Sequence, residues 1–459
     1  MLVPNKTGLL KSFLGNLPGH IAARLAMAVE VDRLMEGEAL PHEDILTGLR
    51  PMLRNEHYDR TPTPLRLFCH PFQDLLVSAP RKTKQKAAIA RASLMPVWNW
   101  ISQSLLPVDA AAYARESKAL VLAHKPDLAL ERAAAFWPQA AAAMTQALCT
   151  DAGVRAAQKA LGDAPAVEDA REMALLLSAG PAIGALQALL PKPVANFSES
   201  LVWDTRAIYD ELARTCPDAA PYVAVIVMNR LAKPWEALRL PLLVTRHTDD
   251  TLIAKTDMGL VGEILFDRMD ALRSAIQMTR HPLFDADVLM EQVKSFAELS
   301  VNIVREIEIR REGEWGRRLL AERAQIGRVM EGFMDRAPRE FAAALPSNRA
   351  TGADFSRHPG AEKHEMALRY ARLVAGSRHF AAAASFGAKQ KEICDSLCTA
   401  LQRYNEDLVR DLKRPRPGQQ DVLNAQFELC AELSAILFGE EEAEMLRRRA
   451  RAAQASAAA

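Results

Sequence analysis

Apolar residues recur at intervals of three and four along almost the whole chain, and this spacing restricts the fold more than any other feature. The stripes are clearest at residues 393–412 and 423–437. Side chains at these intervals lie on one face of an α-helix. The strand-like runs 222–228 and 240–245 are short enough to be buried helical turns. The pattern therefore predicts an all-α protein.

Proline divides this helical pattern into segments of modest length. Pro41, Pro107, Pro126 and Pro221 each precede or open such a segment. Proline fits the first turn of a helix, where its missing N–H would have had no partner. No self-similar period of the kind that repeat families show is visible. We therefore expect an irregular multi-helix array or a solenoid-like bundle.

The clearest linker is at residues 347–360, where turn-forming residues gather and the helical period weakens. We expect a main helical domain at 1–346, with a further division near residue 195 as an alternative. Residues 440–459 carry a run of glutamates, then arginines and an Ala-rich end. We expect them to form a charged, disordered tail.

Between the linker and the tail, residues 361–439 are predicted to form a C-terminal bundle. Segments 389–413 and 419–438 each carry an apolar stripe, and a short proline-rich connection joins them. This arrangement is typical of an antiparallel pair of helices. We therefore expect a C-terminal helical hairpin.

The charge balance limits the partners that the chain attracts as a whole. It has 58 Lys and Arg residues against 57 Asp and Glu residues, which gives a formal net charge of +1. A chain so balanced does not coat nucleic acid through its overall field, so a polyanion must bind locally. Hydrophobic residues make up 49% of the chain, which is ample for a folded core.

Cysteine usage and the start of the chain predict a cytoplasmic protein. Six cysteines scattered over 459 residues fit reduced thiols better than a disulfide framework. The first residues lack the cationic and apolar regions of a signal peptide. The uncharged segments 133–150 and 173–191 are only weakly apolar and are interpreted as pairs of short buried helices, so membrane binding is not expected. The preference for Arg over Lys, with abundant Ala, resembles proteins of bacteria with GC-rich genomes.

The strongest local charge signal is a basic run at residues 81–86, inside a window from 75 to 108 that holds no acid. Pro80 is expected to begin a helix there, and cations do not stabilise a helix N-terminus. An anionic partner is one explanation, and a solvated basic turn is the other. The candidate anion-binding residues are Arg81, Lys82, Lys84, Lys86 and Arg91.

Two observations weaken the anion-binding hypothesis. On a helix these cations divide between two sides, and an acid-free window of this length is expected about once by chance in such a chain. Trp98 and Trp100 lie nearby and aromatic rings can stack on bases. However, Trp98 belongs to a core stripe with Ile101, which leaves Trp100 as the ring expected to be exposed.

A second polar patch begins at Arg246, Asp249 and Asp250. Paired carboxylates can bind a divalent cation or act as acid and base. The spacing fits no known metal loop. In the alternative interpretation, Asp249 caps a helix that starts at about Asp250. The later acids Glu263, Asp267 and Asp270 would then lie on its solvated side.

Cys394 and Cys398, four residues apart, could share a zinc ion with His379 and His364. Zinc prefers four ligands in close pairs, so buried thiols are the favoured interpretation. The chain also lacks a phosphate-binding glycine loop, a GxSxG motif and a GxGxxG motif. We therefore assign no catalytic, cofactor-binding or metal-binding residue and expect no cofactor.

These observations favour a non-enzymatic cytoplasmic helical protein that acts through protein–protein contacts, as a scaffold or a regulatory partner. One alternative is binding of nucleic acid or another polyanion through residues 81–91. The other is an α-helical enzyme with an acidic site between residues 246 and 270. The sequence leaves the oligomeric state open.

Overall fold

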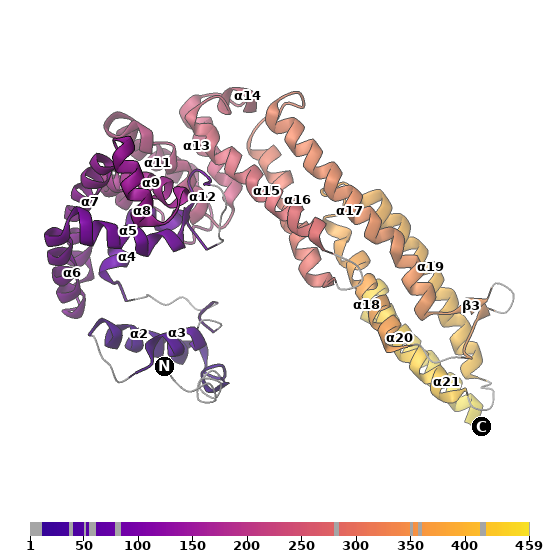
Figure 1. Cartoon of the computed structure of the whole chain (residues 1–459). Coiled ribbons are helices and arrows are strands. Elements are labelled where there is room, and N and C mark those ends of the chain that lie inside the picture. The colour runs from indigo at the N-terminus through magenta and orange to yellow at the C-terminus, as the bar shows by residue number, and fades with distance from the viewer. Residues whose placement is uncertain are drawn as a thin grey trace. The chain divides into compact units, whose positions relative to one another are not determined.

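Helices account for nearly all the regular structure in the described part of the chain (Figure 1). The computed structural model describes residues 12–35, 40–49, 52–54, 61–78, 84–279, 284–348, 352–356, 360–413 and 419–458. Among these residues the strands are two residues long: β1 (Leu76–Val77) pairs in parallel with β2 (Ile89–Ala90), and β3 (Ser347–Asn348) pairs antiparallel with β4 (Gly352–Ala353). The predicted all-α class is confirmed.

The chain divides into two compact units, Met1–Lys233 and Pro234–Ala459. This division lies neither at the expected linker, residues 347–360, nor near residue 195. The described part of that linker belongs to the second unit, where the backbone N–H of Ala353 donates to Asp407 Oδ2 at 3.0 Å. The remaining residues of the predicted linker, 349–351 and 357–359, lie outside the described residues.

The first unit is built from helices of short to medium length. They are α2 (Gly19–Leu34), α3 (His42–Leu49), η1 (Met52–Arg54), α4 (Pro64–Phe68), η2 (His70–Leu75), η3 (Arg91–Ser93), α5 (Leu94–Trp100), η4 (Ile101–Leu105), α6 (Pro107–Leu122), α7 (Pro126–Ala147), α8 (Asp151–Leu161), α9 (Ala164–Ser178), α10 (Gly180–Leu189), α11 (Glu199–Thr215), η5 (Pro217–Ala219) and α12 (Tyr222–Arg230). Helix α7 packs against α6 and α9. Its fully buried Phe136 stacks on Tyr113 of α6, with ring centroids 4.6 Å apart.

Two predictions for this unit need correction. Residues 126–147 form one helix, α7, with Pro138 inside it, and not a pair of short helices. Trp100, expected to be exposed, is 8% exposed, because α5 packs against α8 as well as against η4. Trp98 contacts the aromatic core as expected, with its ring 5.2 Å from that of Phe68.

Within the described residues no single helix is both long and apolar enough to cross a membrane. Helices α9 and α10 reach the required length and apolar character only when taken together, and they meet at a bend of 76°. The buried runs 222–228 and 240–245 are helical, within α12 and α13 (Arg239–Thr245), as the alternative interpretation predicted.

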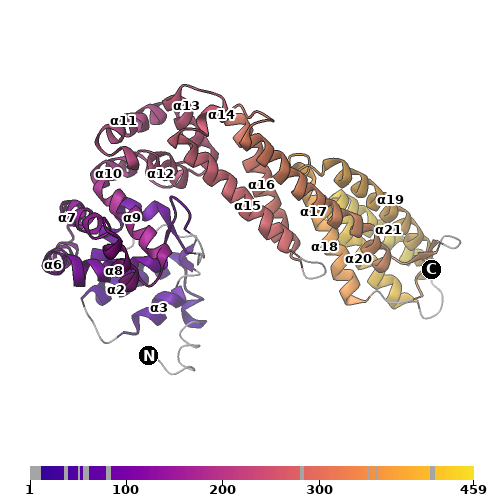
Figure 2. The same ribbon diagram turned by 45° about the horizontal axis from the view of Figure 1, so that its top comes forward.

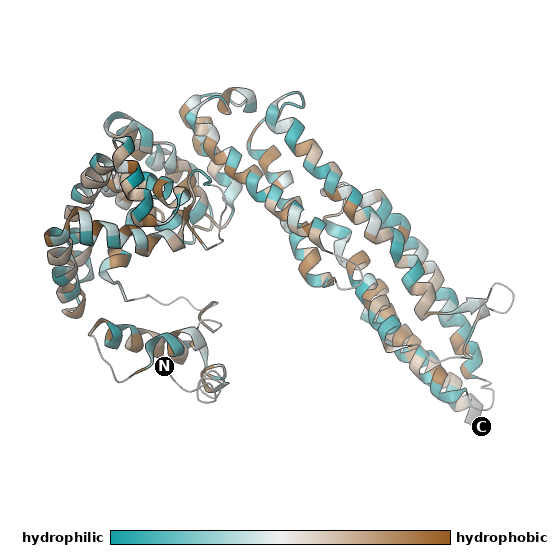
Figure 3. Cartoon of the chain, viewed as in Figure 1, coloured by the Kyte–Doolittle hydropathy of each residue, from teal (hydrophilic) through white to brown (hydrophobic). Residues whose placement is uncertain are grey.

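The second unit contains the longest helices. They are η6 (Pro234–Leu238), α13, α14 (Asp250–Ile253), η7 (Asp257–Gly259), α15 (Leu260–Met278), α16 (Ala286–Glu306), α17 (Glu314–Ala344), α18 (Ala361–Gly376), η8 (Ser377–His379), α19 (Gly387–Leu412), α20 (Gln420–Phe438) and α21 (Glu440–Ala458). Hydrophilic and hydrophobic residues are interspersed along these helices, as expected for amphipathic helices that pack against one another (Figure 3). The two helices predicted near the C-terminus are present as α19 and α20, which lie side by side (Figure 2).

Residues 440–458 form helix α21, where a disordered tail was expected. The helix packs against α19 and α20 and buries Ala443, Leu446 and Ala450. These residues recur at intervals of three and four, so they form a narrow apolar stripe among the charges. The small alanines make the stripe inconspicuous in the sequence, although they allow close helix packing.

Candidate functional site

The described part of the basic run is a loop between two short strands, and not the first turn of a helix. Strand β1 ends at Val77 and β2 begins at Ile89, and residues 84–88 between them are not helical. Arg81 and Lys82 lie outside the described residues, so their role in anion binding stays a prediction. Lys84, Lys86 and Arg91 are described and differ sharply in their surroundings.

Lys84 is bound inside the fold. Its Nζ lies 2.7 Å from Asp169 Oδ1, forms an ion pair with Glu172 and donates to the carbonyl of Ala88 at 2.8 Å. The two carboxylates lie three residues apart on one face of α9, and their side chains are 3% and 6% exposed. Two buried acids therefore match this cation, so its charge is not available to an external anion.

The same carboxylates hold the loop in place. Glu172 Oε1 accepts hydrogen bonds from the backbone N–H of Ala87 at 2.7 Å and from the Tyr222 hydroxyl at 2.6 Å. Asp169 Oδ2 accepts one from Ser93 Oγ at 2.6 Å. Burial, together with the nearby Glu172, raises the pKa of Tyr222, which keeps its hydroxyl protonated as a donor. The cluster therefore joins the loop to α9 and α12 and has a structural role.

Lys86 and Arg91 are the exposed cations of the described candidates. Arg91 begins the short turn η3 and forms no ion pair with a described residue. It lies at the lining of a pocket of about 680 Å³ within the first unit, a volume typical of small-molecule sites. Of the three described candidates for anion binding, Arg91 is the one that lines this pocket.

We call this pocket the cation-rich pocket. It is lined by Pro62, Leu65, Arg66, Leu67, Cys69, His70, Gln73, Asp74, Leu76, Arg91, Leu94, Lys192 and Arg230. Four of these side chains are permanently cationic and one is acidic. Arg66, Lys192 and Arg230 were not predicted, because they come from three separate parts of the chain and no local pattern connects them.

Arg230 is a structural cation of the pocket. Its guanidinium donates to the carbonyls of Leu190 at 2.5 Å and Gln187 at 3.2 Å, and it forms an ion pair with Asp74 Oδ2 at 2.8 Å. Lys192 lies 3.7 Å from the other oxygen of Asp74, and its side chain is 54% exposed. Asp74 therefore satisfies Arg230 fully and Lys192 only in part.

Arg66 also has its own counterion. Its guanidinium binds Glu30 of α2 through two nitrogens, at 2.9 and 3.2 Å, and Glu30 is 5% exposed. The four cations of the pocket are thus opposed by two carboxylates, Asp74 and Glu30, which leaves two positive charges. Arg91 and Lys192 carry them, and both are exposed to solvent.

Cys69 and His70 supply neither a nucleophilic thiolate nor a positive charge to the pocket. Burial raises the pKa of the Cys69 thiol to about 12, so it is not a nucleophile at neutral pH. Burial, assisted by Arg230 and opposed by Asp74, lowers the pKa of His70. The imidazole, stacked on Trp137 with ring centroids 6.1 Å apart, is therefore neutral at pH 7. It therefore adds no positive charge to the pocket.

At the acidic patch the interpretation of Asp249 as a helix cap is confirmed. Asp249 accepts from the N–H of Thr251 at 2.9 Å and pairs with Arg310 at 2.7 Å, and its hydrogen bonds to Thr251 lower its pKa. Asp250 is 1% exposed and burial raises its pKa, whereas Arg246 is exposed at the end of α13. The three residues predicted for this site therefore occupy different environments.

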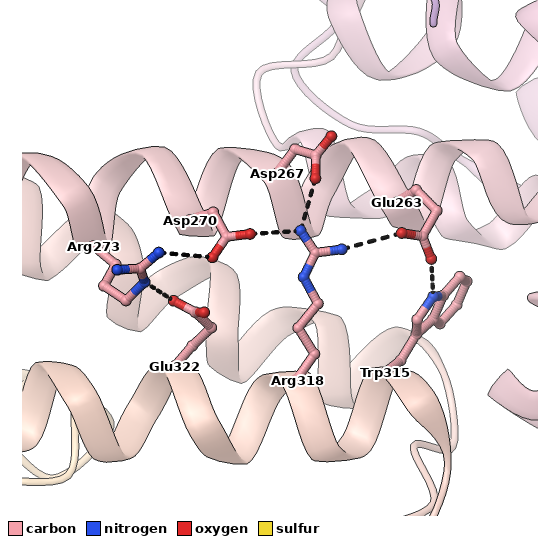
Figure 4. A network of polar contacts seen from close by, with 7 residues as sticks. All are labelled: Glu263, Asp267, Asp270, Arg273, Trp315, Arg318 and Glu322. Carbon is pink, nitrogen blue, oxygen red and sulfur yellow. Dashed lines mark hydrogen bonds and ion pairs between the residues drawn. The ribbon is translucent and has the colours of Figure 1, made fainter. Parts of the chain in front are cut away.

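The later acids of that patch lie on α15, and not on the short helix α14 that Asp249 caps. Their side chains are 36–49% exposed, as a solvated side predicts, and they also form a network with α17 (Figure 4). Arg318 of α17 lies 2.7 Å from Asp267, 2.7 Å from Asp270 and 3.1 Å from Glu263. Arg273 joins Asp270 to Glu322, at 3.2 and 2.7 Å. These pairs link the two helices, and guanidinium groups contact each of the carboxylates.

The cysteines of α19 do not complete a zinc site. Cys394 is buried and Cys398 is half-buried. In the described part of the chain, no three or more His, Cys, Asp or Glu side chains are arranged to hold a metal ion. His364 lies 3.9 Å from Glu432. A four-ligand zinc site at Cys394 is therefore not formed by the described residues.

Comparison with known proteins adds no relative. No protein-family model, no curated protein and no solved structure matches the chain. The cation-rich pocket is the candidate site on its own geometry.

Proposed function

We propose that the protein is a non-enzymatic binding protein whose first unit holds an anionic ligand in the cation-rich pocket. The observation that carries this proposal is the excess of charge: four cations line the pocket, and the nearby Asp74 and Glu30 match only two of them. Arg91 and Lys192 are the residues proposed to contact the anion.

The surroundings of the pocket strengthen this attraction. A recess lined partly by leucines has low-dielectric walls, which concentrate the field of the cations lining it. Hydrogen bonds from Arg or Lys to an anion are charge-assisted and roughly twice as strong as neutral ones. Arg230 and Arg66 are matched by their counterions, so the excess positive charge of the pocket belongs to Arg91 and Lys192.

This proposal differs from the polyanion hypothesis based on the basic run. Lys84 is matched by buried acids, so the described part of the run offers only Lys86 and Arg91. A pocket of about 680 Å³ suits a small ligand better than a nucleic-acid strand, which needs an extended groove. Nucleic-acid binding is the competing outcome of the test.

Titration calorimetry with inorganic phosphate, a mononucleotide and a single-stranded oligonucleotide would test the proposal. We expect a small anion to bind the wild-type protein and to bind the double variant Arg91→Gln/Lys192→Gln at least about 10-fold more weakly, which corresponds to one lost charge-assisted contact. Lys86→Gln is the matched control, because Lys86 is an exposed cation outside the pocket lining.

Two results would count against anion binding in the pocket. One is that none of the small anions binds at millimolar concentration. The other is equal weakening by Lys86→Gln and by the double variant, because surface charge in general would then explain the binding. Preference for the oligonucleotide, with a steep salt dependence, would favour the polyanion hypothesis instead.

We propose protein–protein contact as a second function. Trp203 of α11 is 53% exposed, and the guanidinium of Arg206 lies over its ring at 5.8 Å. Trp and Arg are enriched among the residues that dominate binding energy at interfaces. Affinity purification from the source cell should lose specific partners with Trp203→Ala and keep them with Val108→Ala, an apolar control at a still more exposed position. Retention of all partners by Trp203→Ala would reject this surface.

A further inference from the structure

Two cysteines of the second unit lie within reach of each other on one face of α19. Cys394 and Cys398 are four residues apart, so their Cβ atoms are about 5–6 Å apart. Cys394 is 4% exposed, whereas Cys398 is half-buried and reaches solvent. Burial, together with the neighbouring Cys394, raises the pKa of Cys398 to about 11. The pair thus combines a buried sulfur with one that solvent can reach.

A third group completes the arrangement. Arg378, in the turn η8, donates from Nη2 to Cys394 Sγ at 3.4 Å. This contact crosses from one element to another and orients the sulfur toward a fixed positive charge. A guanidinium at this distance stabilises negative charge on the sulfur atoms.

We propose that Cys394 and Cys398 form a two-coordinate site for a soft, thiophilic monovalent cation of the Cu(I) type, with Arg378 as the positioning residue. Soft thiolate ligands select such ions over zinc, which prefers four ligands. Binding releases two protons: one Cu⁺ and two thiols give a dithiolate complex of net charge −1 and two H⁺. Arg378 then balances the charge of the complex.

Formation of a disulfide between the same cysteines is disfavoured. A disulfide needs Cβ atoms about 3.5–4.5 Å apart, which is closer than residues four apart on a helix. A metal ion between the two sulfurs spans the longer distance, because each metal–thiolate bond is about 2.3 Å long. The helix therefore suits a bridging cation without losing its backbone hydrogen bonds.

The test is anaerobic titration of the full chain with Cu(I) against a chromophoric copper chelator. We expect one tightly held ion per chain, an affinity at least about 100-fold lower in Cys394→Ser and Cys398→Ser, and about 10-fold lower in Arg378→Gln. Cys149→Ser is the matched control, because Cys149 is an exposed thiol outside the pair.

Circular dichroism of each variant separates loss of the site from loss of the fold. Half-buried Cys398 is the safer substitution, so a folded Cys398→Ser that no longer retains Cu(I) supports the site. The proposal is overturned if the wild-type chain does not compete with the chelator, or if folded Cys398→Ser keeps the wild-type affinity. Equal loss with Cys149→Ser would likewise overturn it, because binding by scattered thiols would then suffice.

Discussion

Lys84 Nζ lies 2.7 Å from Asp169 Oδ1, and this contact joins the loop before β2 to helix α9. The most conspicuous charge signal in the sequence thus includes a cation that is used inside the protein. Two buried carboxylates surround it, and a solvent-facing arginine, Arg91, lies a few residues further along. The number of basic residues in a run therefore does not give the positive charge that is exposed to a binding partner.

Replacing Lys84 should destabilise the first unit strongly. Lys84→Ala leaves Asp169 and Glu172 buried without their counterion, which we expect to cost about 3–5 kcal/mol. Chemical denaturation followed by circular dichroism measures the change. Lys86→Ala, an exposed neighbour, should change the free energy of unfolding by less than about 0.5 kcal/mol. Equal losses of stability in the two variants would contradict the conclusion that Lys84 neutralises buried carboxylates.

Glu322 should make the stability of the second unit depend on pH near neutrality. Burial and the neighbouring Asp270 raise its pKa from 4.5 to about 7. Between these values the folded state binds more protons than the unfolded state, so the free energy of unfolding falls as the pH rises through this range. We expect wild type to lose about 1–3 kcal/mol more than Glu322→Gln between pH 4.5 and pH 8.

Denaturant unfolding of both proteins across this pH range measures that difference. Parallel pH profiles for wild type and Glu322→Gln would show that the carboxyl group of Glu322 keeps its ordinary pKa. Arg273 pairs with this carboxyl group at 2.7 Å, and its charge acts to lower the pKa of Glu322. Arg273→Gln should therefore steepen the dependence on pH.

Arg318 should stabilise the contact between α15 and α17. It pairs with three carboxylates, and its side chain is 24% exposed, so solvent weakens each pair. We expect Arg318→Gln to lower the free energy of unfolding by about 1–2 kcal/mol. Arg317→Gln is the matched control, because Arg317 is the exposed neighbour on the same helix. A loss of the same size in both variants would mean that only general surface charge matters.

Helix α21 should depend on Leu446, which is 4% exposed. Leu446→Ala removes buried methyl groups, and we expect it to cost about 2–3 kcal/mol and to increase hydrogen exchange in residues 440–458. The adjacent Met445 is 48% exposed, so Met445→Ala should have little effect. Rapid exchange throughout this helix in the wild-type protein would instead favour the disordered tail that the charges predicted.

The candidate site was only partly predictable from the sequence. Arg91 was named for its place near the basic run, and it does line the pocket. Lys192 and Arg230 were not named, because their charge matters only when the fold brings them to residues 62–76. The exposure of Trp100 was also predicted wrongly, because it depends on distant helices. A helical stripe predicts one buried face, whereas α5 is covered on more than one side.

The sequence by itself determined the all-α class and the places of helices such as α19 and α20. Helical hydrogen bonds and the apolar period that accompanies them lie within a few neighbouring residues, so a short stretch of chain carries the signal. Only the tertiary structure decided which charged side chains remain exposed and free to bind a partner. Lys84 meets Glu172 from 88 residues away, and burial next to such a distant counterion, not the local composition, determines whether a cation can attract a partner.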